Sequence, residues 1–243
     1  MKKVILTIGI LAGFVFFCQS NAFAYSVLWG TWNYQAETSA KAGKVDDFAL
    51  DEDSSPPSSL PISSYAEKYY SIAYAVADAE PGELESSSYA ASLARRAKGI
   101  SNVLLSNYFC VVGGQTGDII PTYLTGNLDG LLLNLGDNSH SEVDARVWFR
   151  GNLRLHFSES LDGEGLVPVD EEDTTMIYPK FGNWYLIEAR LHTEADTQGL
   201  ALASSIFSPD SFTFDVTPIP EPATMSLLGM GLLGLVGLRR KRG

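Results

Sequence analysis

Apolar and polar side chains alternate with a period of two along much of the chain after residue 70. In residues 70–77 the larger side chains occupy one set of alternate positions, and serine or alanine occupies the other. This spacing predicts a β-strand, which the Glu-Pro-Gly sequence at residues 80–82 would end as a turn. A helix remains an alternative over residues 65–76, where four apolar residues also recur at helical spacing. It also remains open over residues 85–98, which Gly99 would cap.

Strand signals are clearer beyond Gly99, where apolar runs alternate with glycine-, aspartate- or asparagine-containing turns. The expected strands cover residues 103–112, 119–124, 128–135, 143–149, 153–157, 183–191, 200–206 and 212–216. Many short strands at such spacing predict a mainly β fold, a β-sandwich or jelly roll, over residues 65–217. Before it, residues 25–64 are expected to hold one or more N-terminal strands and then an acidic, Ser/Pro-rich mobile loop or linker at residues 46–61.

The N-terminus has the organisation of a cleaved secretory signal peptide, expected as a helix over residues 1–24. Lys2 and Lys3 form a positive region, and an apolar stretch follows at residues 4–17. Ala22 and Ala24 supply the small residues that signal peptidase recognises, which makes Tyr25 the expected first residue of the mature protein.

The C-terminus, residues 218–243, combines three features in a fixed order. The motif Pro220, Glu221 and Pro222 comes first, an apolar, glycine-broken segment follows at residues 223–238, and a basic tail ends the chain. The tail consists of Arg239, Arg240, Lys241 and Arg242. The apolar segment predicts a single transmembrane helix, although it is shorter than the ~20 residues of a comfortable span. The basic tail would stay on the cytoplasmic side.

This three-part pattern resembles a PEP-CTERM sorting signal, found on proteins that bacteria with a two-membrane envelope export. The resemblance implies recognition by an exosortase, a transient stay in the inner membrane through the C-terminal anchor, and a final location at the cell surface or outside the cell. Proteins of this group often accompany exopolysaccharide and biofilm production. The resemblance covers the tail alone and assigns no activity to the rest of the chain.

The net charge of the exported part limits which kinds of molecule it can bind. All 29 acidic residues lie between Tyr25 and Pro222, whereas the two termini hold six of the 17 basic residues, so the exported part carries about −18. Such a charge argues against nucleic acid and anionic lipid surfaces, which both require a basic patch. Cys110 is the single cysteine outside the signal peptide, so no intramolecular disulfide is expected, and its apolar neighbours predict a small buried side chain.

No catalytic motif is present. Serine-hydrolase, Walker and dinucleotide-binding glycine patterns are all missing, and His140, His156 and His192 have no spacing typical of a zinc site. His156 and His192 can still meet if their strands are adjacent. Calcium is the one cofactor left open, because acidic turns offer oxygen ligands. The candidate ligands are Asp137, Glu142, Asp162 and Glu164.

Aromatic residues offer a second kind of site. Trp32 and Tyr34 lie outside the main array of strands and are the candidates for stacking against sugar rings, whereas Trp148 and Trp184 are expected in the core. We therefore expect a non-enzymatic surface or extracellular-matrix protein, associated with exopolysaccharide and biofilm, that binds glycan or serves a purely structural role. The alternative is a secreted carbohydrate-active hydrolase that uses acidic residues. A hydrolase requires paired acids with raised pKa values in a cleft, whereas a binding module requires exposed aromatics on one face.

Overall fold

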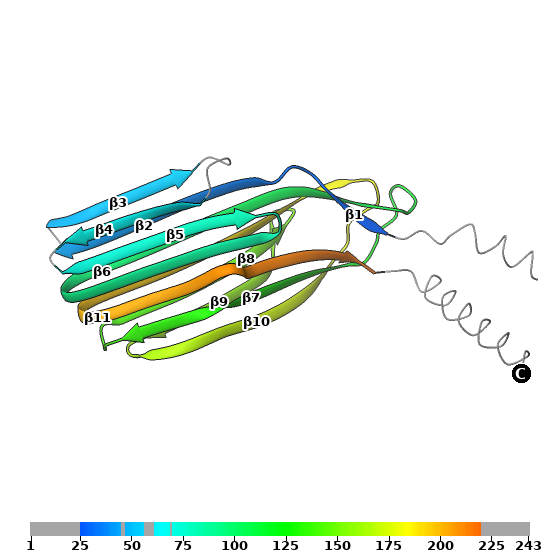
Figure 1. Ribbon diagram of the computed structural model, residues 1–243. Helices are drawn as coiled ribbons and strands as arrows, with labels where there is room; N and C mark the ends of the chain where they lie inside the picture. Colours follow the sequence, from blue (N-terminus) through cyan, green and yellow to red (C-terminus); the bar gives the residue numbers. More distant parts are fainter. Residues whose placement is uncertain (1–24, 45–46, 56–60, 69, 220–243) are drawn as a thin grey trace, which may run out of the picture.

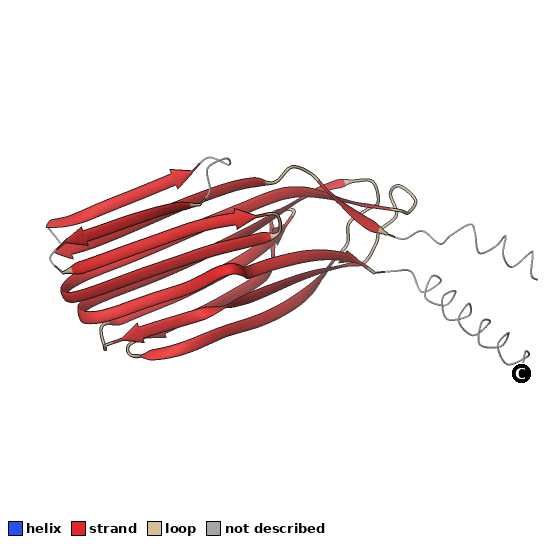
Figure 2. Ribbon diagram, viewed as in Figure 1, coloured by secondary structure: helices blue, strands red, loops and turns tan. Residues whose placement is uncertain are grey.

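The computed structural model describes residues 25–44, 47–55, 61–68 and 70–219, and within these ranges the chain is mainly β, as predicted (Figures 1 and 2). The strands are β1 (Ser26–Trp29), β2 (Asn33–Lys44), β3 (Asp47–Ser55), β4 (Ile62–Lys68), β5 (Ser71–Glu80), β6 (Glu83–Val112), β7 (Thr122–Leu135), β8 (Ser139–Phe149), β9 (Asn152–Asp162), β10 (Gly165–Ile177) and β11 (Trp184–Pro218). Among these residues no helix is long and apolar enough to cross a membrane. The expected signal helix, sorting motif, transmembrane helix and basic tail lie outside the described residues.

Two very long strands, β6 and β11, organise the fold. They pair antiparallel along almost their whole length, from Trp184 opposite Cys110 to Thr213 opposite Glu83. The register shifts between Gly199 and Ala201, and near this point both strands turn back (Figure 1). Each long strand therefore contributes one half to each of two facing layers.

The two layers have the same plan, with all strand pairs antiparallel. Layer A has the order β4, β5, residues 83–92 of β6, residues 201–218 of β11, β7 and β10. Layer B has the order β3, β2, residues 95–112 of β6, residues 184–199 of β11, β8 and β9. The short β1 pairs with the last residues of β6.

Near the bend the two layers lie so close together that their backbones are in contact. A Cβ atom built on Gly99 of layer B would lie 2.6 Å from the carbonyl oxygen of Tyr74 and 2.9 Å from that of Tyr89, both in layer A. Sheets that face each other ordinarily lie ~10 Å apart, with side chains filling the space. The buried apolar residues at this end are accordingly all alanine: Ala40, Ala42, Ala66, Ala73, Ala90, Ala97, Ala195 and Ala203.

Hydroxyl groups join the two layers in this narrow region. The Ser101 hydroxyl donates to the carbonyl oxygen of Val76 at 2.7 Å. The hydroxyls of Ser86 and Thr193 lie 2.9 Å apart and form a hydrogen bond between the layers. Buried hydroxyls are costly unless paired, so these bonds allow serine and threonine to serve as interior residues.

The opposite end of the molecule is wider and contains large side chains. Phe109 of β6 packs against Phe149 of β8, with ring centroids 5.8 Å apart, and Trp29 stacks on Trp32 at 5.0 Å. β1 and the last residues of β11 both lie at this end, so both ends of the described chain are here (Figure 1). The described chain thus ends at the wide end of the fold, one residue before the sorting motif in the sequence.

Two sequence-based expectations about the strands are wrong, and one open alternative is excluded. The acidic segment expected as a loop at residues 46–61 contains β3, an edge strand paired with β2, where carboxylates remain in solvent. The strand predicted over residues 70–77 is confirmed as part of β5, and residues 85–98 lie in β6, so the helical alternatives are excluded there. Small side chains on one face of these strands fill the narrow space between the layers. The separate strands expected at residues 183–191, 200–206 and 212–216 are parts of β11, and residues 103–112 are part of β6.

Candidate functional site

The outward side of β8 and of the first half of β11 forms a mostly polar face of layer B. Along β8 the odd-numbered residues are buried, and the even-numbered residues point outward. The same alternation holds in the first half of β11, where the buried residues run from Ile187 to Thr197 at odd positions. The outward residues of these two central strands are His140, Glu142, Asp144, Arg146 and Trp148 on β8 and Glu188, Arg190, His192, Glu194 and Asp196 on β11.

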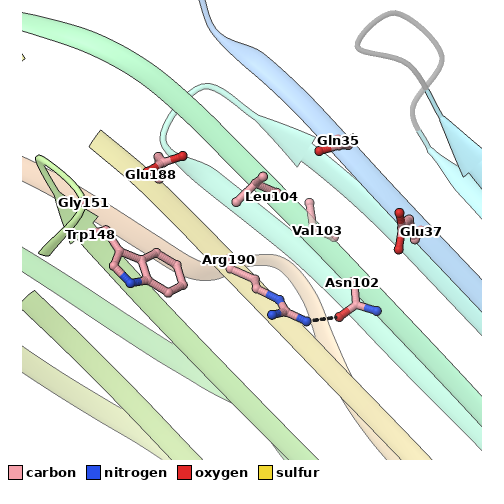
Figure 3. Close-up of a pocket in the computed structure, with 9 residues that line it drawn as sticks. All are labelled: Gln35, Glu37, Asn102, Val103, Leu104, Trp148, Gly151, Glu188 and Arg190. Carbon is pink, nitrogen blue, oxygen red and sulfur yellow. Dashed lines mark hydrogen bonds between the residues drawn. The ribbon is translucent and has the colours of Figure 1, made fainter. Parts of the chain in front are cut away.

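A groove of about 500 Å³ lies on this polar face (Figure 3). Its lining residues come from β2, β6, β8 and β11 and from the turn after β8: Gln35, Glu37, Asn102, Val103, Leu104, Trp148, Gly151, Glu188 and Arg190. We call it the Trp148 groove. Trp148 supplies its aromatic surface, and the Arg190 guanidinium donates to the Asn102 side-chain oxygen at 2.8 Å.

The composition of the Trp148 groove determines which ligands it can hold. The groove is lined by one half-buried indole ring and the apolar Val103 and Leu104, together with a guanidinium, two carboxylates and two amides, so apolar surface and hydrogen-bonding groups of both kinds are present in it. A ligand with apolar faces and many hydroxyl groups matches this arrangement. A flat hydrophobic ligand would leave the polar groups without partners, which is costly.

The histidines and carboxylates farther along the polar face form two hydrogen-bonded clusters. His192 Nε2 lies 3.2 Å from Glu142, and His140 Nε2 lies 3.3 Å from the other oxygen of the same carboxylate. In the second cluster, the Asp144 carboxylate accepts a hydrogen bond from the Arg146 guanidinium at 2.8 Å, and its Oδ2 lies 2.9 Å from His156 Nε2.

The sequence left open a contact between His156 and His192 on adjacent strands, and the structure does not place them so. His156 is on β9 and His192 is on β11, with β8 between them, so these two strands are not adjacent. Glu142, His192 and Glu194 each offer one ligand atom within 4.8 Å of the others, which makes them a group able to hold a metal ion.

The pKa values of two side chains in these clusters are set by burial and by hydrogen bonds. Burial lowers the pKa of His140, but hydrogen bonds to Asp162 and Glu142 outweigh it and raise that pKa above its ordinary 6.5. Burial raises the pKa of the Asp144 carboxyl, but hydrogen bonds from Arg146 and His156 outweigh it and hold that pKa below 3.8. Both groups are therefore stabilised in their charged forms at neutral pH.

A second groove, of about 640 Å³, lies on layer A near the bend, and its character is different. Its lining residues are mostly apolar: Glu67, Tyr70, Ile72, Ala91, Ser92, Leu93, Leu135, Gly136, Leu200, Ala201 and Leu202. Leu93 and Leu200 are 60% and 76% exposed. This groove offers few polar groups, so it lacks the chemistry that recognises a ligand rich in hydroxyls.

The candidate calcium ligands come from two neighbouring turns. Asp137 lies in the turn before β8 and Glu164 in the turn after β9, and the Gly163 amide donates to the Ser139 carbonyl oxygen at 2.8 Å. Of the four candidates, Glu142 belongs to the group of described residues that could hold a metal ion. Asp162 instead lies 2.7 Å from His140 Nδ1, and Glu142 lies between two imidazoles. The mixed group at Glu142 depends on cross-strand register, which no local spacing in the sequence reveals.

Two tryptophans are less buried than expected. Trp32 and Tyr34, proposed for sugar stacking, are half-buried and pack against the main core. Trp184, expected inside, is 52% exposed, and Trp148 lines the groove. The signal that could have placed Trp148 is its phase, because it shares the even-numbered set of β8 with four polar residues. Cys110 is buried, as predicted.

Comparison with known proteins identifies the C-terminal segment. Residues 218–241 match the family model of the PEP-CTERM protein-sorting motif, so the predicted resemblance is confirmed, and the chain ends in this motif. Such a motif implies export and exosortase-mediated processing of the C-terminus. The match overlaps the strands at Pro218 alone, the last residue of β11.

The β-rich part of the chain has no comparable assignment. No curated protein matches the sequence. A solved structure described as TmCBM61 in complex with β-1,4-galactotriose is similar at 12% identity, covering 82% of this chain and 92% of that one, with a TM-score of 0.21. A score this low does not establish a common fold, and the function of the β-rich part rests on the geometry above.

Proposed function

We propose that this protein is an exported, exosortase-sorted surface or extracellular-matrix protein whose facing β-layers, a β-sandwich, bind polysaccharide without cleaving it. The observation that carries the proposal is the Trp148 groove, where one indole ring stands among hydrogen-bonding side chains on a rigid sheet face. The sorting motif supports the location, because it implies export and exosortase-mediated processing of the C-terminus.

The ligand we propose is a neutral polysaccharide. A pyranose ring has an apolar face of C–H groups, which packs on an aromatic ring, and a rim of hydroxyls, which pair with Arg190, Asn102 and Glu188. The chain carries a net charge of −12, which would repel a strongly anionic polymer. The groove crosses strands from β2 to β8, so an extended chain can lie along it.

Catalysis receives less support from the acidic residues. Burial and the nearby Asp78 raise the pKa of Glu85, and burial and Glu159 raise the pKa of Glu171. Neither Glu85 nor Glu171 lines either of the two grooves described above. The observation that favours a hydrolase is that Glu37 and Glu188 line the same groove, as the paired carboxylates of a glycosidase must.

Affinity electrophoresis tests the binding proposal. Full-length protein is run through gels that contain hydroxyethylcellulose, xyloglucan or galactomannan, with alginate as the anionic comparison. We expect retardation by at least one neutral polymer and a loss of affinity of at least about tenfold in Trp148→Ala, the effect of removing one aromatic anchor.

Trp184→Ala is the matched control, because Trp184 is an exposed tryptophan of the same layer outside the groove. Equal losses in the two variants, or no retardation by any neutral polymer, would refute the groove as a glycan site. If the protein releases reducing ends from a polymer, and Glu37→Gln or Glu188→Gln abolishes this release, then the function is hydrolysis instead of binding.

A further inference from the structure

The pairing of β8 with β11 places Glu142 directly opposite Glu194, with His192 two residues before Glu194 on the same outer face. One ligand atom from each of these three residues lies within 4.8 Å of the other two. We propose that Glu142, His192 and Glu194 form a binding site for a divalent transition-metal ion of the zinc class. This inference does not depend on the polysaccharide proposal.

The orientation of His192 is the second observation that supports the site. Arg190 donates to Asn102 Oδ1 at 2.8 Å, which identifies this atom as the acceptor, and His192 Nδ1 lies 2.8 Å from it. The Nδ1–H group therefore donates to Asn102, and Nε2 is directed toward Glu142 Oε1, 3.2 Å away. Metal-binding histidines are usually held in this way, with one nitrogen donating to an oxygen and the other facing the ion.

A nitrogen lone pair and a carboxylate oxygen that face each other are both acceptors, so a cation between them stabilises the pair. His140 lies on the other side of Glu142. Its Nδ1 lies 2.7 Å from Asp162, and its Nε2 lies 3.3 Å from Glu142 Oε2. The Glu142 carboxylate thus lies between two imidazoles, each of which is oriented by an oxygen on its far side.

The donor set selects the type of ion. One imidazole nitrogen with two carboxylates suits zinc and similar metals, whereas calcium takes six to eight oxygen ligands. The His192 side chain is 18% exposed and that of Glu142 is 37% exposed, so an ion can enter from solvent and keep water ligands. Lys98 forms an ion pair with Glu194, and a bound metal would compete with this ammonium group.

Zinc titration of the untagged full chain, held in mild detergent and stripped with EDTA, tests the proposal. We expect one zinc ion per chain, measured by competition with a fluorescent zinc chelator, and no displacement by millimolar calcium. His192→Gln should weaken binding by at least tenfold, and Asn102→Ala should weaken it by roughly tenfold through the loss of orientation. Lys98→Met should tighten binding, because it removes the competing cation.

His156→Gln is the matched control, since His156 contacts Asp144 and lies outside the group. Circular dichroism verifies that each variant is folded. The site is refuted if folded wild-type protein binds no zinc saturably, or if His192→Gln and His156→Gln bind it alike. If Trp148→Ala still binds zinc, the zinc site stands whether or not this variant loses affinity for polysaccharide, so the two proposals can be told apart.

Discussion

Substituting alanine for Gly99 tests whether the two layers are in backbone contact near the bend. The added Cβ would lie 2.6 Å from the Tyr74 carbonyl oxygen, whereas ordinary contact begins at about 3.4 Å. Both obstructing atoms, in Tyr74 and Tyr89, belong to the backbone of layer A and cannot rotate away. The layers must therefore separate locally by about 0.8 Å to admit one methyl group.

The energetic effect of this separation has two opposing parts. Inserting a methyl group into a closely packed interior costs ~1–3 kcal/mol, and a gap of 0.5–1 Å removes roughly a quarter to a half of the dispersion energy of each neighbouring contact. Replacing glycine by alanine also restricts the unfolded chain, which stabilises a protein by ~0.4–1 kcal/mol where the site has room. We expect a net loss of about 1–3 kcal/mol in the free energy of unfolding.

Urea denaturation, followed by tryptophan fluorescence at pH 7, measures this loss. Gly165→Ala is the matched control, because Gly165 is also in a strand, and its added Cβ would meet only the movable end of the Leu161 side chain, at 3.1 Å. We expect that control to be neutral or slightly stabilising. A Gly99→Ala variant as stable as the wild type, or more stable, would refute backbone contact between the layers.

Two further predictions concern charge and sorting. Burial and the facing Asp78 raise the pKa of Glu85 above 4.5, so ionisation of Glu85 lowers stability as the pH rises through that raised pKa. Glu85→Gln should therefore be more stable than the wild type to urea at pH 7 and equal to it at pH 4; a less stable variant at pH 7 would contradict this sign. Replacing Pro220, Glu221 and Pro222 together by alanine should leave the C-terminal segment attached and the protein in the inner membrane, as shown by intact mass and fractionation, whereas the wild type loses the segment. Retention of the segment by both proteins would show that it is an ordinary anchor.

The sequence predicts the β character of the chain because side-chain alternation is a local property. It does not predict which set of alternate positions is buried. In β5 a hydrophobicity argument would place Ile72 and Val76 inside, but Ser71, Ala73 and Ala75 are the buried residues. The reason is steric, since the opposite layer lies too close for larger side chains.

Long-range register limits the prediction of the site in the same way. Glu142 and His192 are 50 residues apart in the chain, and only the pairing of β8 with β11 brings them together. Proximity in the sequence indicates the calcium candidates but does not detect a mixed carboxylate and imidazole group. The position of Trp148 was available from its polar neighbours in β8, but the period of the alternation was considered without its phase.

The acidic strands β3 and β10 bear on how copies of this protein behave when they are crowded. β3 is the edge of layer B on one open side, and β10 is the edge of layer A on the other. Asp51, Glu52 and Asp53 are exposed on the first, and Asp170 and Glu172 are exposed on the second. An uncharged edge would invite another strand to add to the sheet, whereas like charges on both sides repel it. Many copies can thus stand close together as separate molecules, kept from joining into a continuous fibril by electrostatic repulsion at their sides.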